Sequence, residues 1–255
     1  MKKSLLILVA LLLLIVPLYS EELELNTTLA GVTGNIGIPS AMVTSNFENP
    51  TITTGYTGIY DFQKGFSHIP FIEVGFLKNF EAGVAVDITK EELDLLINAK
   101  WRFIDKDKVA FAFGMVGELL TIREDLSFGG KAYFASTFNS SFVGLASKTS
   151  IVLGYSIDKN SIDSNIDFGM AFQSPFFPKV FKEKVDFIID FGNVAYSNNP
   201  SGGNANNRGM LNVGLRVLPL RLMKGTYLTL DLSFIDLFDH SGRAVSLGAS
   251  FSFMP

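Results

Sequence analysis

Hydrophobic and polar residues alternate strictly along several segments of this chain. In the last twelve residues, AVSLGASFSFMP, the odd positions from Val245 to Phe253 are apolar, and the even positions from Ser246 to Ser252 are small and mostly polar. Side chains of a strand point alternately to its two faces, whereas a helix would need apolar residues at spacings of three and four. The segment is therefore predicted to be a strand with one apolar face and one small, wet face.

The same alternation recurs along most of the chain. The pattern is clean in five further segments: 80–88, 151–158, 166–173, 185–192 and 228–234. It is less regular in another five: 69–77, 95–103, 109–115, 126–135 and 211–217. Turn or loop sequences such as DKDK (105–108) and DHSGR (239–243) separate these segments. We expect about twelve antiparallel strands from Thr51 onward, joined as an up-and-down meander, with one short helix near 176–184.

Two all-β architectures share this pattern, and they differ in the direction of the apolar faces. A soluble sandwich turns them inward, and a transmembrane barrel turns them outward to lipid. The polar faces are crowded with small residues such as Gly83, Ala112 and Gly169, which suit the concave inside of a narrow barrel. Because an unpaired backbone group is costly in hydrocarbon, such a sheet must close on itself. The predicted fold is an all-β transmembrane up-and-down antiparallel barrel, with a secreted sandwich as the alternative.

The first residues, MKKSLLILVALLLLIVPLYSEE, have the organisation of a secretory signal peptide. Lys2 and Lys3 precede an apolar core that is too short to span a membrane, and Pro17 follows it. We predict a signal peptide over 1–20, cleaved after Ser20, with an uncleaved anchor as the alternative. Residues 21–49 are assigned to an N-terminal periplasmic or plug segment, and 50–255 to the barrel.

Composition narrows the function further. The 255 residues include no Cys, which excludes a lipid-anchored lipoprotein and leaves no disulfides. Without Lys2 and Lys3, 19 basic residues stand against 25 acidic ones, a net charge of −6, so we expect no nucleic-acid partner. His68 and His240 are the only histidines, and neither a G-x-S-x-G nor an H-E-x-x-H motif occurs. We therefore expect no enzymatic activity, no cofactor and no metal.

If the apolar faces look outward, charged residues of both signs line the lumen. These candidate lumen-lining residues are Glu73, Glu81, Asp87, Lys100, Arg102, Lys131, Asp167, Asp186, Asp190, Arg216 and Asp231. They have two interpretations: mutual pairing in a solvated or plugged lumen, or tuning of ion and solute selectivity in a narrow pore. Eight strands leave a filled barrel and sixteen an aqueous channel, so about twelve admit either state.

Two stretches resemble known outer-membrane proteins. The C-terminal strand is similar to the terminal signal of bacterial outer-membrane barrels, although that signal normally ends on the aromatic residue and Met254 and Pro255 follow it here. GVTGNIGIPSAMVT (31–44), IEVGFLKNFEAGVAVDI (72–88) and LLINAKWRFIDKDKVAFAFGM (95–115) resemble the start and the repeated strand pairs of YjbH-type exopolysaccharide-associated barrels. This resemblance covers about residues 31–115, and it implies only an outer-membrane barrel with a short N-terminal segment.

These observations lead to one functional hypothesis and one rival. We expect a porin-like channel of the bacterial outer membrane for passive passage of small solutes or ions. The rival is a non-conducting barrel with a structural, adhesive or envelope-polymer export role. The expected partners are outer-membrane lipids, small solutes and the barrel-assembly machinery, which would recognise strand 244–253. Residues 196–209, rich in Asn, Ser and Gly, are interpreted as a flexible surface loop.

Overall fold

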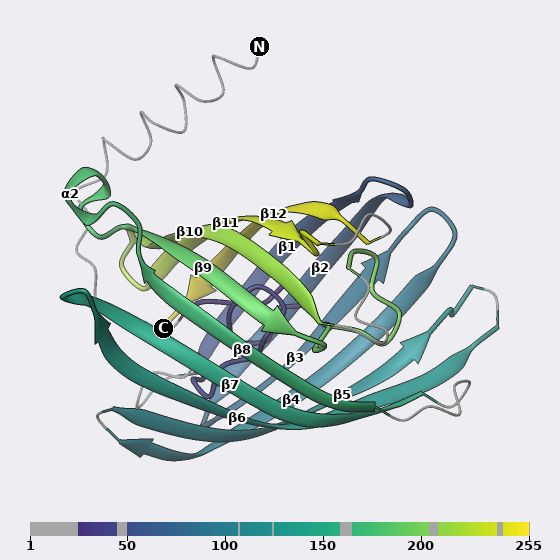
Figure 1. Ribbon diagram of the computed structural model, residues 1–255. Helices are drawn as coiled ribbons and strands as arrows, with labels where there is room; N and C mark the ends of the chain where they lie inside the picture. The colour runs from purple at the N-terminus through teal and green to yellow at the C-terminus, as the bar shows by residue number, and fades with distance from the viewer. Residues whose placement is uncertain are drawn as a thin grey trace.

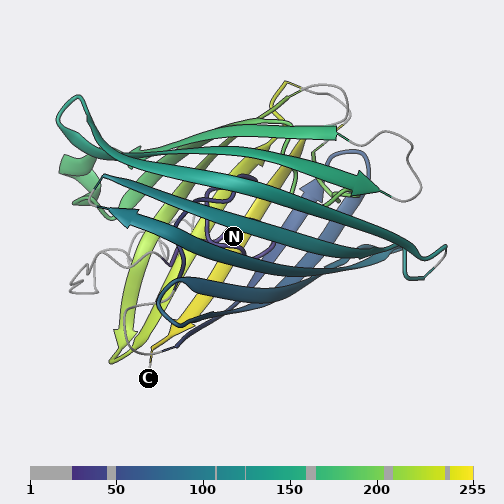
Figure 2. The same ribbon diagram turned by 90° about the horizontal axis from the view of Figure 1, so that it is seen from below.

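The chain forms a closed barrel of twelve antiparallel strands, seen from two sides in Figures 1 and 2. The computed structural model describes residues 25–44, 50–106, 108–123, 125–158, 165–203, 209–238 and 242–254. Its elements are β1 (Thr51–Asp61), β2 (Gly65–Phe76), β3 (Phe80–Ile88), β4 (Leu93–Lys106), β5 (Val109–Leu120), β6 (Ser127–Phe142), β7 (Leu145–Asp158), β8 (Asn165–Pro175), α2 (Pro178–Phe181), β9 (Val185–Gly192), β10 (Met210–Met223), β11 (Thr226–Ile235) and β12 (Ala244–Phe253). Among the described residues, no helix has the length and apolar character needed to cross a membrane.

Each strand pairs with its neighbours in the sequence, and β12 closes the sheet on β1. In that seam Gly55 pairs with Ser250 and Thr57 with Gly248. The register shifts between Val217 and Leu220 in β10, on either side of Pro219. A proline has no N–H to give to the ladder, so a local irregularity accommodates it. The closed ladder leaves no sheet edge, as a sheet in hydrocarbon requires.

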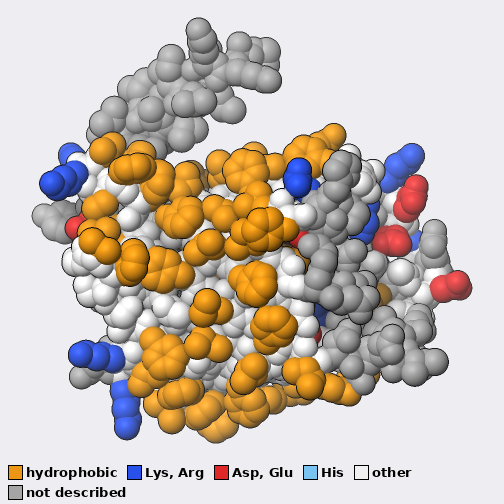
Figure 3. Space-filling model, in the orientation of Figure 1, with side chains coloured by type: hydrophobic (Ala, Val, Ile, Leu, Met, Phe, Trp, Pro, Cys, Tyr) orange, Lys and Arg blue, Asp and Glu red, His pale blue; other side chains and the backbone are white. Residues whose placement is uncertain are grey.

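The apolar faces of the strands point outward. On β12, Leu247 is 63% exposed, whereas Ser246 and Ser250 are each only 2% exposed. Figure 3 shows the resulting surface, on which hydrophobic side chains cover most of the visible barrel wall. A soluble sandwich would bury its phenylalanines and expose its aspartates, so the sandwich alternative is wrong. The prediction of an outward-facing apolar surface on an all-β barrel is confirmed.

A row of aromatic rings follows the outer surface near one end of the barrel. Phe80 stacks on Trp101 with ring centroids 5.9 Å apart, and Phe103 lies 5.7 Å beyond Trp101. Phe76 extends the row on one side and Phe111 on the other. Aromatic side chains are enriched at the boundary between lipid and water, where they form girdles around membrane barrels. We call this row, Phe76–Phe80–Trp101–Phe103–Phe111, the aromatic band.

The two ends of the barrel differ in their connections. One end of the barrel contains the start of β1 and the end of β12. The short turns after β2, β4, β6 and β10 lie at this end, and so does α2 after β8. We call this the terminal end, and the opposite end, with the connections after β1, β3, β5, β7, β9 and β11, the loop end. The aromatic band lies toward the terminal end. The short helix α2 lies within the predicted range 176–184.

Residues 25–44 lie inside the barrel, as the purple segment of Figures 1 and 2 shows. They form only two isolated bridges, Thr27 with Thr33 and Gly34 with Pro39, and no strand. Their apolar side chains are buried against the inner wall: Leu29 and Ile36 join one core cluster, and Ile38 and Ala41 join a second one. The core of this molecule is therefore formed between this inner segment, residues 25–44, and the barrel wall.

Candidate functional site: the barrel lumen

The eleven candidate lumen-lining side chains all point into the barrel. Nine of these residues are less than a tenth exposed. The side chain of Lys131 is 8% exposed, and that of Asp231 is 19% exposed. They come from eight strands because the inward positions of each strand recur every second residue. Their strands are β2 (Glu73), β3 (Glu81, Asp87), β4 (Lys100, Arg102), β6 (Lys131), β8 (Asp167), β9 (Asp186, Asp190), β10 (Arg216) and β11 (Asp231).

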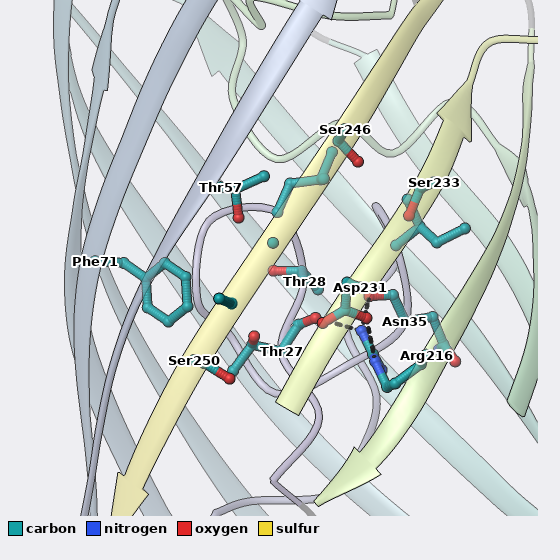
Figure 4. Close-up of a pocket in the computed structure, with 14 residues that line it drawn as sticks. Thr27, Thr28, Asn35, Thr57, Phe71, Arg216, Asp231, Ser233, Ser246 and Ser250 are labelled. Carbon is teal, nitrogen blue, oxygen red and sulfur yellow. Dashed lines mark hydrogen bonds and ion pairs between the residues drawn. The ribbon is translucent and has the colours of Figure 1, made fainter. Parts of the chain in front are cut away.

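Arg216 holds the inner segment from the β10 side. Its Nη1 donates to the Gly34 carbonyl at 2.8 Å, and Nη2 donates to the Thr27 and Asn35 carbonyls at 2.6 and 3.2 Å. Nε donates to Oδ1 of Asp231, which orients the guanidinium (Figure 4). The planar fork of an arginine can serve several acceptors at once. Arg216 therefore satisfies three backbone carbonyls of a segment that has almost no secondary structure of its own.

Asp190 performs the complementary task for backbone amides. Its Oδ2 accepts hydrogen bonds from the N–H groups of Ile36 and Gly37, at 3.1 and 2.8 Å. Its other oxygen accepts from Nδ2 of Asn212 at 2.7 Å. Hydrogen bonds between an ionised acceptor and backbone N–H groups are stronger than neutral ones. The turn at residues 36–37 is thus fixed to the β9–β10 wall through its main chain.

A third contact joins the inner segment to β3 and β4. Lys100 Nζ lies 2.7 Å from Glu81 Oε1 and donates to the Thr33 carbonyl at 2.9 Å. The Glu81 carboxylate accepts from the Thr33 N–H at 3.1 Å and from the Thr44 N–H at 3.2 Å. Glu73 accepts from the hydroxyl groups of both threonines, at 3.1 and 3.3 Å. Five predicted lumen residues therefore contact the inner segment directly, mainly through its backbone.

The connection after β9 also enters the barrel. Tyr196 is 8% exposed, and its hydroxyl donates to Asp87 at 2.6 Å. The Ser201 hydroxyl donates to the same carboxylate at 2.7 Å. Burial raises the pKa of the Tyr196 phenol well above its usual range, and the charge of Asp87 raises it further. Tyr196 consequently keeps its proton and remains a donor to Asp87 at ordinary pH.

Other residues of this connection bind the same mouth of the lumen. Lys131 Nζ donates to the Ala195 carbonyl at 2.7 Å, and the Asn198 N–H donates to Glu118 at 3.0 Å. The interpretation of 196–209 as a flexible surface loop is thus wrong for residues 196–203, which fold inward. Residues 204–208 lie outside the described part of the chain. Donors of the inserted connection thus take the place of water molecules that would otherwise hydrate the carboxylates of the wall.

The remaining predicted residues pair locally along the wall. Arg102 Nη2 donates to the Lys78 carbonyl at 3.2 Å and lies 3.1 Å from the Asp105 carboxylate. Asp186 accepts from Nε2 of Gln173 at 2.6 Å. Asp167 accepts a short hydrogen bond from Ser156 across the β7–β8 pair. None of these contacts involves the inner segment, and Arg102 Nε is buried without a hydrogen-bond partner among the described residues.

Small cavities remain between the inner segment and the wall. One of about 20 Å³ lies beside Arg216 and is lined by small polar residues of β11, β12 and β1, including Ser233 and Ser250 (Figure 4). Another, of about 30 Å³, includes Asn98 and Tyr133 in its lining. The hydroxyl groups of Ser250 and Tyr133 are buried without a hydrogen-bond partner among the described residues. Each cavity is large enough for a water molecule that would satisfy them.

A larger cavity opens at the loop end of the barrel. It has a volume of about 410 Å³, and its lining includes Lys64, Ser67, Lys90 and Glu91, with residues 199–201 at its edge. Asn199 Nδ2 donates to Glu92 at 2.9 Å, which fixes this part of the lining. The cavity is a polar vestibule above the inserted connection.

Sequence reasoning missed several residues that hold the inner segment and the loop. Glu118 belongs to the inward series of β5, which begins at Ala110 and Ala112, but the predicted segment, 109–115, ends before it. Extending the alternation by three residues would have found it. Thr33 and Tyr196 gave no such signal because each lies outside regular structure. His68 is on β2 and faces outward, with Nδ1 2.5 Å from the Tyr56 hydroxyl, and His240 lies outside the described residues.

No protein-family model matches the chain, and no curated protein matches its sequence. Solved structures are similar in fold. The KdgM porin superposes with a TM-score of 0.51 at 7% identity, over 79% of this chain and 98% of that chain. The chain therefore shares the closed-barrel fold of this porin. A structure of the KdgM porin in complex with disordered oligogalacturonate gives a TM-score of 0.52 at 6% identity, over 79% of this chain and 98% of that one.

A further similar structure is the NanC porin in a rhombohedral crystal form. It has a TM-score of 0.49 at 10% identity, over 78% of this chain and 98% of that chain. The KdgM superpositions confirm the predicted barrel class of about twelve strands. The finer resemblance of residues 31–115 to YjbH-type barrels stays a prediction.

Proposed function

We propose that this protein is a porin-like channel of the bacterial outer membrane that allows passive passage of small solutes or ions. The observation that carries the proposal is a closed barrel with an apolar exterior and charged side chains of both signs on its inner wall. Barrels of this architecture span outer membranes, with short turns on the periplasmic side and longer loops outside. The terminal end is accordingly the periplasmic one, and strand 244–253 would be recognised by the barrel-assembly machinery.

We further propose that the inner segment acts as a constriction of the lumen. The signal peptide over 1–20, the plug segment over 21–49 and the barrel over 50–255 form the corresponding domain organisation. Residues 25–44 are buried along almost their whole length and are held by Arg216, Asp190 and Lys100. With this segment in place, passage is confined to the remaining gaps beside it, so we expect a small conductance.

The wall charges favour cations among the permeating ions. Of the eleven predicted lumen residues, seven are acidic and four are basic, and Asp94 and Glu118 add two inward carboxylates. A lumen with a net negative charge concentrates cations and repels anions. The oligogalacturonate of the KdgM complex is a polyanion, and this charge balance supports smaller neutral or cationic solutes instead.

A non-conducting barrel is the second candidate, and the filled lumen favours it. The inner segment and the connection after β9 both occupy the interior, and the cavities beside the inner segment measure only about 10–30 Å³. Such a barrel would have a structural, adhesive or envelope-polymer export role, which is where the YjbH-type resemblance would belong. An enzymatic role is not proposed, because His68 faces outward from β2.

Single-channel recording of the purified full-length protein in planar bilayers separates the two candidates. The channel proposal predicts discrete conductance steps and a reversal potential in a KCl gradient that shows preference for K⁺. Absence of steps at every voltage, in protein that shows the heat-modifiable migration of a folded barrel, would establish the non-conducting alternative.

A further inference from the structure

Exposed basic side chains gather at the terminal end of the barrel. They belong to the turns after β2, β4 and β10 and to the α2 connection after β8, and several appear in blue at that end in Figure 3. We call this set the basic collar: Lys78, Lys106, Lys108, Lys179, Lys182, Arg221 and Lys224. The collar is unexpected in a chain whose charge without the leader is −6.

The collar carries little compensating negative charge among the described residues. Two exposed acidic residues lie at this end, Asp105 and Glu183, and Asp105 already pairs with Arg102 at 3.1 Å. At the loop end, by contrast, exposed Lys64 and Lys90 are balanced by acidic residues such as Glu91. Among the described residues, the terminal end is therefore a positive rim on a protein that is negatively charged overall; Asp107, in the turn after β4, lies outside the described residues.

The collar lies directly beside the aromatic band. The Arg102 N–H donates to the Asn79 carbonyl at 2.8 Å, and Arg102 Nη2 donates to the Lys78 carbonyl. These bonds fix the turn after β2 next to Trp101 and Phe80, which stack on each other. Since the aromatic band marks the edge of the hydrocarbon, the collar lysines lie at the depth of lipid headgroups.

Apolar residues project from the same rim. Leu77 is 78% exposed, Val143 is 85% exposed, Phe177 just before α2 is 62% exposed, and Val180 within α2 is 70% exposed. Turn tips facing bulk water would seldom carry so many large apolar side chains. Basic residues interspersed with exposed apolar ones are typical of surfaces that lie within a membrane interface, where the apolar groups insert and the lysines reach the phosphates.

We propose that the basic collar binds the headgroups of anionic phospholipids in the membrane leaflet at the terminal end. Each lysine offers a compact ammonium charge that pairs with a phosphate. A negatively charged leaflet raises the binding constant by roughly fivefold for each lysine near its surface. The proposal rests on the membrane-spanning barrel but not on conduction. It specifies a lipid class and a leaflet that the fold alone does not.

The test uses Trp101, the only tryptophan of the chain, as a local reporter. The full-length protein is reconstituted in vesicles that contain either brominated phosphatidylglycerol or brominated phosphatidylcholine, and quenching of Trp101 fluorescence gives the relative affinity for the two lipids. We expect about two- to fivefold preference for phosphatidylglycerol, lost in about 0.5 M NaCl because salt screens exposed charges.

Two matched variants locate the effect. Lys78→Gln/Lys106→Gln removes two collar charges and should bring the affinity ratio near one, whereas Lys64→Gln/Lys90→Gln removes two charges at the loop end and should leave the preference unchanged. A ratio of one for the wild-type protein, or an unchanged preference in the collar variant, would overturn the proposal. If neither brominated lipid quenches Trp101, the membrane-spanning arrangement itself is wrong.

Discussion

The contact between Arg216 and the inner segment can be removed without leaving a buried charge. In the double variant Arg216→Gln/Asp231→Asn both partners of the ion pair become neutral amides. The variant loses the guanidinium fork that donates to the carbonyls of Thr27, Gly34 and Asn35. We expect a glutamine amide to replace one of the three bonds, because its side chain is shorter and its two donor hydrogens lie on a single nitrogen.

The expected magnitude follows from those bonds. A hydrogen bond from a charged group contributes about 1.5–3 kcal/mol, so the loss of two weakens the docked state by about 3–4 kcal/mol once water satisfies part of the freed carbonyls. At 1.4 kcal/mol per factor of ten, the population with the inner segment undocked rises about 100- to 1000-fold. We expect more frequent or larger conductance steps in planar bilayers than for the wild-type protein.

An accessibility measurement reports the same change independently of conduction. The chain has no cysteine, so Thr28→Cys places a single thiol on the inner segment, where Thr28 is 5% exposed. A water-soluble thiol reagent should label it about 100-fold faster in the double variant. Arg102→Gln is the matched control, because Arg102 is equally lumenal but bonds the turn at 78–79 and not the inner segment. Equal labelling rates in the double variant and the wild type would refute the clamp role of Arg216.

Three further predictions concern the wall and the loop. Gly114→Ala should lower the free energy of unfolding by about 1–3 kcal/mol, because the added Cβ would meet the buried Tyr133 ring. The thermal unfolding midpoint of the barrel should fall accordingly, and an unchanged midpoint would contradict that packing. Leu247→Lys should lower the free energy of unfolding of the barrel by about 2–4 kcal/mol in urea titrations in lipid vesicles, because it places a charge in lipid. Ser246→Lys lies on the lumenal face and should incur less of this cost of transfer into lipid. Tyr196→Phe removes a hydroxyl that donates to Asp87 and accepts from the Ser201 N–H. Hydrogen exchange at the Ser201 amide should become about tenfold faster, and unaltered exchange would show that the Tyr196 hydroxyl does not hold the loop.

The barrel itself could be predicted from sequence because each strand has one face for lipid and one for the lumen. On β3, residues 80–88 coincide with the predicted segment, and the alternation of this segment predicts which of its faces is buried. Strand ends were less accurate. β6 extends to Phe142, well beyond the predicted 135, because Ser136 and Ser140 interrupt the outward apolar series that Phe138 and Phe142 continue.

The contents of the lumen were much harder to predict. The eleven inward charges were identified by parity, but several of them, such as Asp190, Lys100 and Lys131, bind backbone groups of residues 25–44 and 195, which have no periodic pattern. Arg216, for example, donates to the carbonyls of three residues whose side chains play no part in the contact. Backbone recognition leaves no trace in residue type. The Asn- and Ser-rich composition of the inserted connection likewise does not distinguish a solvated loop from one that binds carboxylates.

The direction of the two faces of each strand is the claim on which the membrane assignment and the channel proposal both depend. Spin labels placed singly along β12 at residues 246, 247, 250 and 251 of the reconstituted protein test it directly, through their collision rates with oxygen dissolved in lipid. The account predicts high rates at Leu247→Cys and Phe251→Cys and low rates at Ser246→Cys and Ser250→Cys. The opposite alternation, or equal rates at all four positions, would contradict it.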